Sequence, residues 1–191
     1  MAWLWQRDID DEKRAPDIIY MLRSAFLARP PGISKAAEEL KALGISPGWK
    51  VLDFGCGPGN YSIAAAMLVG STGAVFAMDL HPKALDMVEG KAAAHGLRNI
   101  ETIFSDLDTG LDSGSIDSIL LFSALKRRAV RPLLDELHRI VKASGTVHVR
   151  NPGLKKGRLE DLMVKDGLFH LTGRHGDVLH FGKLEGEFHE I

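Results

Sequence analysis

The chain has 191 residues, 45% hydrophobic and 26% charged, with a formal net charge of −1. This length suits one domain with a sizeable core, and the near-zero charge does not indicate a general nucleic-acid-binding protein. The single cysteine, Cys56, excludes a disulfide framework within the chain. No apolar run approaches the roughly 18 to 20 residues of a membrane span, and the start has no basic leader. We therefore expect a cytoplasmic protein without a membrane span.

Residues 1–32 form a distinct opening piece, which we predict to be an N-terminal helical extension or cap. Its second half has apolar residues at helical spacing and ends at Pro30-Pro31-Gly32. It is interpreted either as an extra helix packed on the core or as a cover over an active site. In the second case Trp3, Trp5 and Tyr20 are possible substrate contacts.

Residues 33–191 are predicted to form a single domain in which strands alternate with helices. The strands are apolar almost throughout, which favours a parallel sheet buried on both faces and hence the α/β class. The last two strands are separated too briefly for a crossover, so they are expected to form a hairpin. Helices are expected at 33–43, from 60 onward, at 82–96, from Pro132 to Gly145, and around 159–167; strands are expected at 51–53, 74–79, 99–104, 116–122, 146–149, 168–172 and 178–182.

The most informative stretch is 51–61, in which an apolar run ends in an acid and three glycines follow at alternate positions. It predicts a strand, a tight turn and a helix. Glycine reaches dihedrals that are closed to other residues and lets a ligand approach the backbone. The first amides of the helix have no partner within the helix and point toward whatever is bound there. From this stretch alone, a structural turn without a ligand stays open.

Spacing separates two kinds of nucleotide-binding turn. The dinucleotide fingerprint has glycines at relative positions one, three and six, whereas Gly55, Gly57 and Gly59 stand at one, three and five. Asp53, just ahead of the turn, is poorly placed beside a pyrophosphate because like charges repel. It is well placed for a ligand with an ammonium or sulfonium group. The electrostatics therefore favour a cationic ligand.

Two later acids extend this interpretation. Asp79 ends the second predicted strand, 20 residues after Gly59, where an acid can accept both hydroxyls of a ribose. The alternative for Asp79 is an acid at the start of the next helix. Asp106 ends the third strand and can accept from the amine of a base, although Asp108 and Asp112 compete for that role. Together with the acid before the turn, they describe a ligand with an amino acid end, a ribose and an aminopurine.

At this point residues 33–150 resemble the class I S-adenosylmethionine-dependent methyltransferases, and within them the small-molecule group of the ubiquinone/menaquinone type. The segments that carry the resemblance are 51–59, 77–80, 105–107, 115–122 and 136–142. It implies a Rossmann-like, doubly wound, seven-stranded mixed sheet, mostly parallel with an antiparallel C-terminal strand and helices on both faces. It also implies an enzyme that binds S-adenosyl-L-methionine, releases S-adenosyl-L-homocysteine and transfers the methyl group to a small-molecule acceptor.

The resemblance also assigns residues to the cofactor. The three glycines would pass beneath its methionyl part, with Asp53 near the ammonium. Asp79 would hold the ribose, Asp106 with Leu107 the adenine, and the residues after the fourth strand would line the pocket. The full set is Asp53, Phe54, Gly55, Cys56, Gly57, Gly59, Tyr61, Asp79, Leu80, Ser105, Asp106, Leu107, Phe122 and Ser123.

The acceptor side is less defined. Lys126-Arg127-Arg128 stands after the fourth strand where such proteins often have a histidine pair, and Ala143-Ser144-Gly145 replaces a Pro-Gly-Gly turn. Ligands of open α/β sheets bind beyond the strand ends, so the acceptor-side candidates are Ser123, Lys126, Arg127, Arg150 and Asn151. A cation there would suit an acidic acceptor; a solvated surface charge is the alternative.

No metal is expected, because the tail histidines His170, His175, His180 and His189 show no ligand spacing. Methyl transfer from a sulfonium needs alignment more than a dedicated base, so no catalytic residue is assigned. Two alternatives stay open: a cofactor-binding partner or regulatory protein without catalysis, and an NAD-dependent oxidoreductase. The oligomeric state is left unassigned.

Overall fold

The computed structural model describes residues 31–122, 130–152 and 156–185. The predicted N-terminal extension therefore lies, except for its last two residues, outside the described residues. Helices and strands alternate along most of the chain and the last two elements are strands, as the apolar pattern predicted. In order they are α3 (Ile33–Ala42), β1 (Lys50–Phe54), α4 (Asn60–Val69), β2 (Ala74–Asp79), α5 (Pro82–Ala94), β3 (Ile100–Phe104), β4 (Ile116–Phe122), α6 (Val130–Ile140), β5 (Val141–Arg150), α7 (Lys156–Val164), β6 (Phe169–His175) and β7 (Val178–Lys183).

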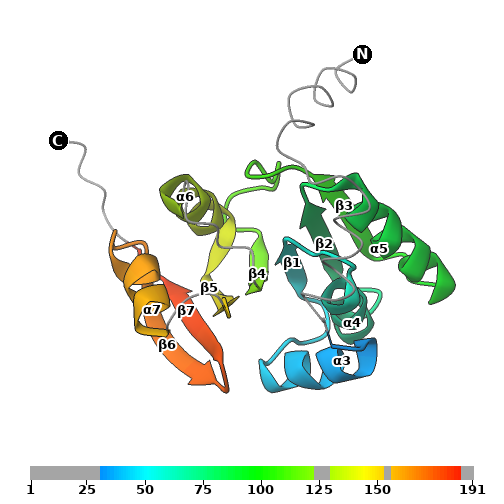
Figure 1. Cartoon of the computed structure of the whole chain (residues 1–191), viewed down its shortest axis with the longest axis horizontal. Helices are drawn as coiled ribbons and strands as arrows, with labels where there is room; N and C mark the ends of the chain where they lie inside the picture. The colour runs from blue at the N-terminus through cyan, green and yellow to red at the C-terminus, as the bar shows by residue number, and fades with distance from the viewer. Residues whose placement is uncertain (1–30, 123–129, 153–155, 186–191) are drawn as a thin grey trace, which may run out of the picture.

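The strands form one sheet of seven in the order β3-β2-β1-β4-β5-β7-β6 (Figure 1). β1 to β5 are parallel, and β7 runs antiparallel between β5 and β6. Only two residues, Gly176 and Asp177, separate β6 from β7, so the chain can return only as a hairpin. The predicted α/β class and the seven-stranded mixed sheet are confirmed.

Helices cover both faces of the sheet and bury the core between them (Figure 1). On one face α6 and α7 pack on a large apolar cluster; on the other, α3, α4 and α5 pack on two smaller clusters. α4 is apolar on nearly every side, and seven of its ten residues are buried. This fixes α4 firmly, and with it the turn that leads into its first residue.

One predicted boundary was wrong. The helix expected to end at Gly145 ends at Ile140, and β5 begins directly after it. The register of β5 on β4 then shifts, so that extra β5 residues bulge. A Cβ on Gly145 would lie 2.7 Å from Val141 Cγ2 and 3.0 Å from the carbonyl oxygen of Ile116. Gly145 therefore lets the bulge pass close to β4, and does not end the helix.

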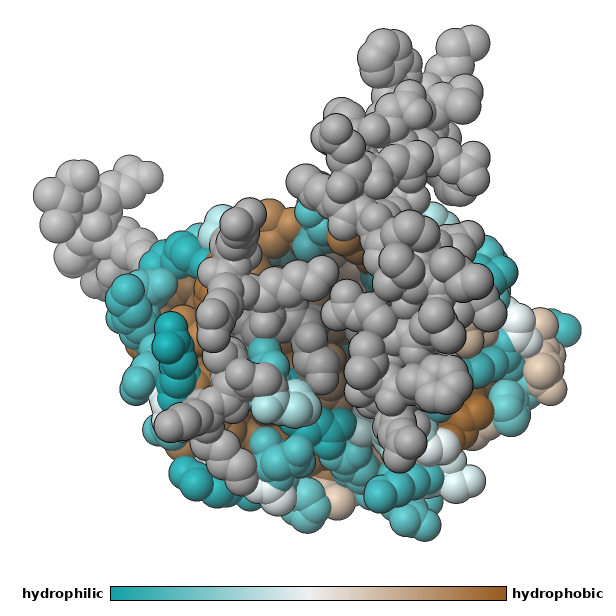
Figure 2. Space-filling model, in the orientation of Figure 1, coloured by the Kyte–Doolittle hydropathy of each residue, from teal (hydrophilic) through white to brown (hydrophobic). Residues whose placement is uncertain are grey.

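Figure 2 shows mainly hydrophilic side chains around the rim of the viewed face, with hydrophobic atoms in scattered spots. Across the described ranges, the exposed large hydrophobic side chains are Met67 and Leu184. Isolated exposed apolar side chains of this kind are ordinary for a protein surface. None of the described helices is long and apolar enough to cross a membrane.

Candidate cofactor-binding site

The glycine turn between β1 and α4 has the conformation that the sequence predicted. Gly55, Gly57 and Gly59 have φ angles of 74°, 54° and 79°, in the left-handed region that favours glycine. Gly59 is also closely packed, since a Cβ there would lie 2.4 Å from Val88 Cγ2 of α5. Glycine at this position thus serves both the dihedral angle and the close approach of α5.

The first half of the turn is tied to the end of β2. The amides of Gly55 and Cys56 donate to the carbonyl oxygen of Met78, at 2.8 and 2.9 Å. The amide of Gly57 donates to Oδ2 of Asp79 at 2.9 Å, and Oδ1 of Asp79 accepts from the amide of His81 at 2.9 Å. A carboxylate oxygen can accept two hydrogen bonds, so Asp79 retains capacity for ligand hydroxyls beside the turn.

Asp53 lies against α4. Its side chain is 3% exposed, and Oδ2 accepts a hydrogen bond from the Ser62 hydroxyl at 2.6 Å. Burial raises the pKa of Asp53 to about 6, and the nearby Asp79 charge adds to this, while the bonds from Ser62 oppose it. The carboxylate is therefore anchored at the first turn of a helix, where the dipole favours a negative charge. Its role beside a ligand ammonium stays a prediction.

The predicted adenine loop follows β3, whose last residue, Phe104, pairs with Asp79. The Ser105 hydroxyl accepts from the amide of Leu107 at 3.3 Å, and Asp106 is exposed. Register therefore brings the end of β3 beside the end of β2. Leu80, which follows β2, is half-buried next to the same edge.

A glutamate of α6 holds the continuation of this loop. Oε1 of Glu136 accepts from the hydroxyl of Thr109 at 2.5 Å and from its amide at 3.1 Å. Arg139 donates to both oxygens of Glu136, at 2.7 and 2.8 Å. The Arg139 guanidinium, followed by Thr109, lowers the pKa of Glu136 to about 2. The loop after β3 is thereby fixed to α6 by a charged and nearly buried acceptor.

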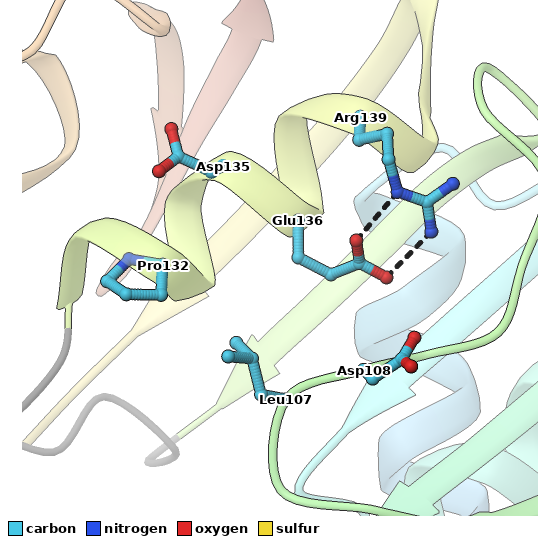
Figure 3. A pocket seen from close by; sticks show the side chains of 6 residues that line it. All are labelled: Leu107, Asp108, Pro132, Asp135, Glu136 and Arg139. Atoms are coloured by element: carbon cyan, nitrogen blue, oxygen red, sulfur yellow. Dashed lines mark hydrogen bonds and ion pairs between the residues drawn. The ribbon is translucent and has the colours of Figure 1, made fainter.

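Between this loop and α6 lies a surface groove of about 380 Å³. Figure 3 shows Leu107 and Asp108 on one side of it and the α6 side chains on the other, with the Glu136–Arg139 pair at its upper end. Leu107 is the residue that this groove shares with the predicted cofactor set. The groove lies on the α6 side of the loop, and the glycine turn does not line it.

A cluster of five side chains joins α3 and the start of α4 to the ends of β4 and β5 and to the β6–β7 turn. The Arg150 guanidinium donates to Oε1 of Glu39 and to the Tyr61 hydroxyl, both at 2.5 Å, and the Tyr61 hydroxyl donates to Oε2 of Glu39 at 2.5 Å. Arg150 lies 4.4 Å from the centre of the Phe122 ring, which meets Tyr61 edge to face at 4.9 Å. Asp177 at the β6–β7 turn lies 3.6 Å from Arg150.

This arrangement decides what Arg150 does among the described residues. The sequence makes Arg150 a candidate cation for an acidic acceptor. In the structure its charge is paired with Glu39, and its side chain is only 18% exposed. It serves to link α3, α4 and β5. Of the other acceptor-side candidates, Asn151 follows β5, whereas Ser123, Lys126 and Arg127 lie outside the described residues.

One of the tail histidines, His180 of β7, meets His148 of β5 on the α3/α4 face of the sheet. Nδ1 of His148 lies 2.9 Å from Nδ1 of His180, and Nε2 of His148 is buried without a hydrogen-bond partner. Burial, and then the neighbouring His180, lower the pKa of His148 to about 3. Within the described part of the chain, no group of three or more His, Cys, Asp or Glu side chains is arranged to hold a metal ion.

Comparison with known proteins supports this reading of the fold and the turn. A family described as "Methyltransferase domain" matches residues 51–145. A probable cobalt-precorrin-6B C(15)-methyltransferase (decarboxylating) from Saccharolobus solfataricus is 37% identical over 76 residues, covering 37% of this chain and 38% of that protein. A demethylmenaquinone methyltransferase from Geobacillus stearothermophilus is 29% identical over 110 residues, covering 56% of this chain and 47% of that protein.

A solved structure extends the likeness beyond the matched sequence. The S-adenosylmethionine-dependent methyltransferase from Aquifex aeolicus superimposes with a TM-score of 0.64 and 25% identity, covering 78% of this chain and 87% of that one. The chain belongs to the class I S-adenosylmethionine-dependent methyltransferases. S-Adenosylmethionine is the cofactor that this membership indicates.

Within this methyltransferase fold, several residues that support the candidate site were not predicted from the sequence. Ser62 anchors the acid before the turn, Glu136 fixes the loop after β3, and Glu39 orients the Tyr61 hydroxyl. Lys91 of α5 contacts the turn itself. Glu136 lies in a segment that carried the family resemblance, which was the one available signal. The others are ordinary polar residues on helices, and only the packing of those helices brings them to the site.

Proposed function

We propose that this chain is an enzyme that transfers a methyl group from S-adenosylmethionine to a small-molecule acceptor. One observation carries the proposal: the three-glycine turn is joined, through the Gly57 amide, to the carboxylate that ends the neighbouring strand, Asp79. A backbone open to ligand approach and an acidic acceptor thus meet at the carboxyl edge of a parallel sheet, where ligands of such sheets bind.

The residues present fit this cofactor. A turn with positive φ at Gly55, Gly57 and Gly59 admits the methionyl part close to the backbone. The remaining lone pairs of Asp79 suit the ribose hydroxyls. The exposed Asp106, with Ser105 and Leu107, is proposed for the adenine, Leu80 for the space between adenine and ribose, and Phe54, Cys56, Tyr61, Phe122 and Ser123 for the pocket around them.

Asp53 is proposed to act through its charge. It is buried beneath the turn and bonded to Ser62, so a cationic ligand above it would favour the ionised carboxylate. Asp53 and Asp79 are proposed to have different roles because their surroundings differ. The Asp53 carboxylate is anchored to the start of α4, whereas the Asp79 carboxylate retains lone pairs at the edge of the sheet.

Methyl transfer from this cofactor depends mainly on the positioning of the acceptor. When bound, the cofactor supplies a methyl group on a sulfonium, which is already activated toward displacement. This chain has to align an acceptor with that methyl group and exclude water, and positioning of this kind is worth roughly 7 to 11 kcal/mol in favourable cases. Asn151, which follows the last residue of β5, is proposed for the acceptor side. A base is needed only for an acceptor whose proton has a high pKa.

The proposal extends to the class of acceptor and to the location of the protein. A net charge of −1 does not favour a nucleic-acid acceptor, and the demethylmenaquinone methyltransferase among the relatives favours a small molecule. We place the protein in the cytoplasm and treat residues 33–191 as one catalytic domain, with residues 1–32 as an extension or cap.

Calorimetric titration with S-adenosylhomocysteine, S-adenosylmethionine and NAD tests the proposal. We expect binding of the first two and none of NAD. Asp79→Ala should weaken S-adenosylhomocysteine binding by roughly 1.5 to 3 kcal/mol, the value of a hydrogen bond to a charged group. Asp161→Ala, which changes an exposed acid of α7, is the control. Unchanged affinity of Asp79→Ala would refute the ribose assignment.

Turnover is tested separately with phenols, amines, thiols and carboxylic acids as acceptors. Methylated product from any class supports an enzyme and names the acceptor atom. Tight cofactor binding with no product from the whole panel would instead support the alternative, a cofactor-binding partner or regulatory protein.

A further inference from the structure

A lysine of α5 holds the second half of the glycine turn. Nζ of Lys91 lies 2.5 Å from the carbonyl oxygen of Pro58 and 2.5 Å from Oδ1 of Asn60. Pro58 lies inside the turn, between two of its glycines, and Asn60 is the first residue of α4. A single ammonium group therefore joins α5 to the backbone of the turn and to the start of the helix that follows.

Asn60 extends this contact toward α3. An ammonium group only donates hydrogen bonds, so Lys91 holds the amide oxygen of Asn60 toward itself and directs the amide nitrogen elsewhere. That nitrogen donates to the carbonyl oxygen of Pro31 at 2.8 Å. Lys91, Asn60 and Pro31 form a chain of hydrogen bonds that runs from α5, past the turn, to the residues just ahead of α3.

The turn needs an anchor of this kind. Glycine loses more conformational freedom on ordering than any other residue, and glycine has no side chain through which a turn could be held. The amides of Gly55, Cys56 and Gly57 fix the first half to β2. Pro58 has no amide hydrogen, so its carbonyl is the group by which the backbone can be held there, and Lys91 binds it.

Stability alone is a poor explanation for this lysine. Lys91 is half-buried, and burial lowers the pKa of its ammonium group, which shows that the surroundings disfavour the charge. Among the described residues no ion pair compensates this charge, because the Lys91 ammonium group contacts two neutral oxygens there. A charge held at this cost beside the turn indicates a role in the conformation of the turn.

We propose that Lys91 is a positioning residue that holds the glycine turn in the conformation that binds S-adenosylmethionine. This rests on the proposed function, since it takes the turn to be the cofactor site. Lys91 acts through Pro58 and Asn60. S-Adenosylmethionine and S-adenosylhomocysteine present the same groups to the turn, so loss of the anchor should weaken both equally. A direct charge effect would instead favour the cationic S-adenosylmethionine once the lysine is removed.

The test uses the full chain in four variants beside the wild type. Lys91→Met removes the charge and keeps the length, Lys91→Arg keeps the donors, and Asn60→Ala removes the other end of the link. Lys83→Met is the matched control, because Lys83 lies on the same helix and its ammonium group pairs with the exposed Asp86, at 3.7 Å, and not with the turn. Affinity for both ligands is measured by calorimetry at a temperature where circular dichroism shows every variant folded.

We expect Lys91→Met to weaken both ligands about tenfold or more with their ratio unchanged, and Asn60→Ala to weaken both in the same direction. Lys91→Arg should stay within about threefold of the wild type and Lys83→Met within about twofold. Wild-type affinity in Lys91→Met would overturn the proposal. So would a lowered melting temperature without loss of affinity, or a selective gain for S-adenosylmethionine. If the wild type binds neither ligand, the proposed function itself fails.

Discussion

Replacing Gly59 by alanine should damage both the stability of the fold and the cofactor site. Two effects add. The φ angle of 79° costs an L-residue roughly 1 to 2 kcal/mol. The new Cβ would lie 2.4 Å from Val88 Cγ2, and overpacking of a filled core costs about 1 to 3 kcal/mol. Gly59→Ala should therefore lower the free energy of unfolding by about 2 to 5 kcal/mol.

A second glycine separates the two effects. Gly44 has a φ of 88°, and a Cβ there would meet nothing within 4 Å. Gly44→Ala should thus cost only the backbone part, about 1 to 2 kcal/mol. Val88→Ala supplies the complementary test. With the valine methyl groups gone, Gly59→Ala should cost little more than Gly44→Ala does, although Val88→Ala alone destabilises the core.

Urea unfolding followed by circular dichroism gives these free energies, and calorimetry with S-adenosylhomocysteine gives the affinity of each variant. Equal losses of unfolding free energy in Gly59→Ala and Gly44→Ala would contradict this prediction, because they would show that the clash with Val88 costs nothing. The prediction would also be refuted by costs of Gly59→Ala and Val88→Ala that simply add, because the two side chains would then not collide.

Two further predictions concern buried charge. The pKa of His148 is about 3 in the folded chain, against a usual 6.5, so between these pH values the unfolded chain binds a proton that the folded chain does not. The contribution of His148 to the free energy of unfolding is therefore fully present above pH 6.5. It falls toward pH 3 by up to about 1.4 kcal/mol per pH unit. Asp53, raised from 3.8 to about 6, acts oppositely and loses stability as pH rises through 6. In urea titrations His148→Gln should therefore flatten the acid loss, and Asp53→Asn should steepen it between pH 6 and 4; an unchanged slope in both would contradict the assignment. Glu136→Gln should cost roughly 1 to 3 kcal/mol in the same assay by weakening its bonds to Thr109, whereas exposed Asp135→Asn should change stability by less than about 0.5 kcal/mol; equal effects would mean that Glu136 does not hold the loop.

The order of the elements was predictable because most of their boundaries have a local cause. Apolar runs of strand length, Pro82 at the first turn of α5 and the glycine turn itself all act within a few residues of where they stand. The boundary that was predicted wrongly, at Gly145, has a non-local cause, because a side chain there would clash with Val141 and with the backbone of β4. From the neighbouring residues in the sequence alone, a glycine after a helical pattern predicts the end of the helix.

The site residues likewise include some whose contacts were predictable from the sequence and some whose contacts were not. The sequence assigned Gly57 and Asp79 to the same ligand, and in the structure the Gly57 amide donates a hydrogen bond to the Asp79 carboxylate. It could not show that Arg150 is occupied by Glu39, because 111 residues separate the two. The sequence therefore left Arg150 open as a cation for the acceptor, whereas in the folded chain Glu39 pairs with it.

Strand, turn and helix around the three glycines follow from the sequence by itself, because backbone dihedrals and apolar periodicity are local properties. The family resemblance and the acids at the ends of the strands follow from it too, since parallel strands bring their carboxyl ends to one edge. How that edge is held depends on the packing of the helices. Ser62 contacts Asp53, Glu136 contacts the loop after β3 and Lys91 contacts the turn, and in each case helix packing brings together residues that are apart in sequence. Contacts of this kind depend on the relative placement of whole elements, and no pattern within one element encodes that.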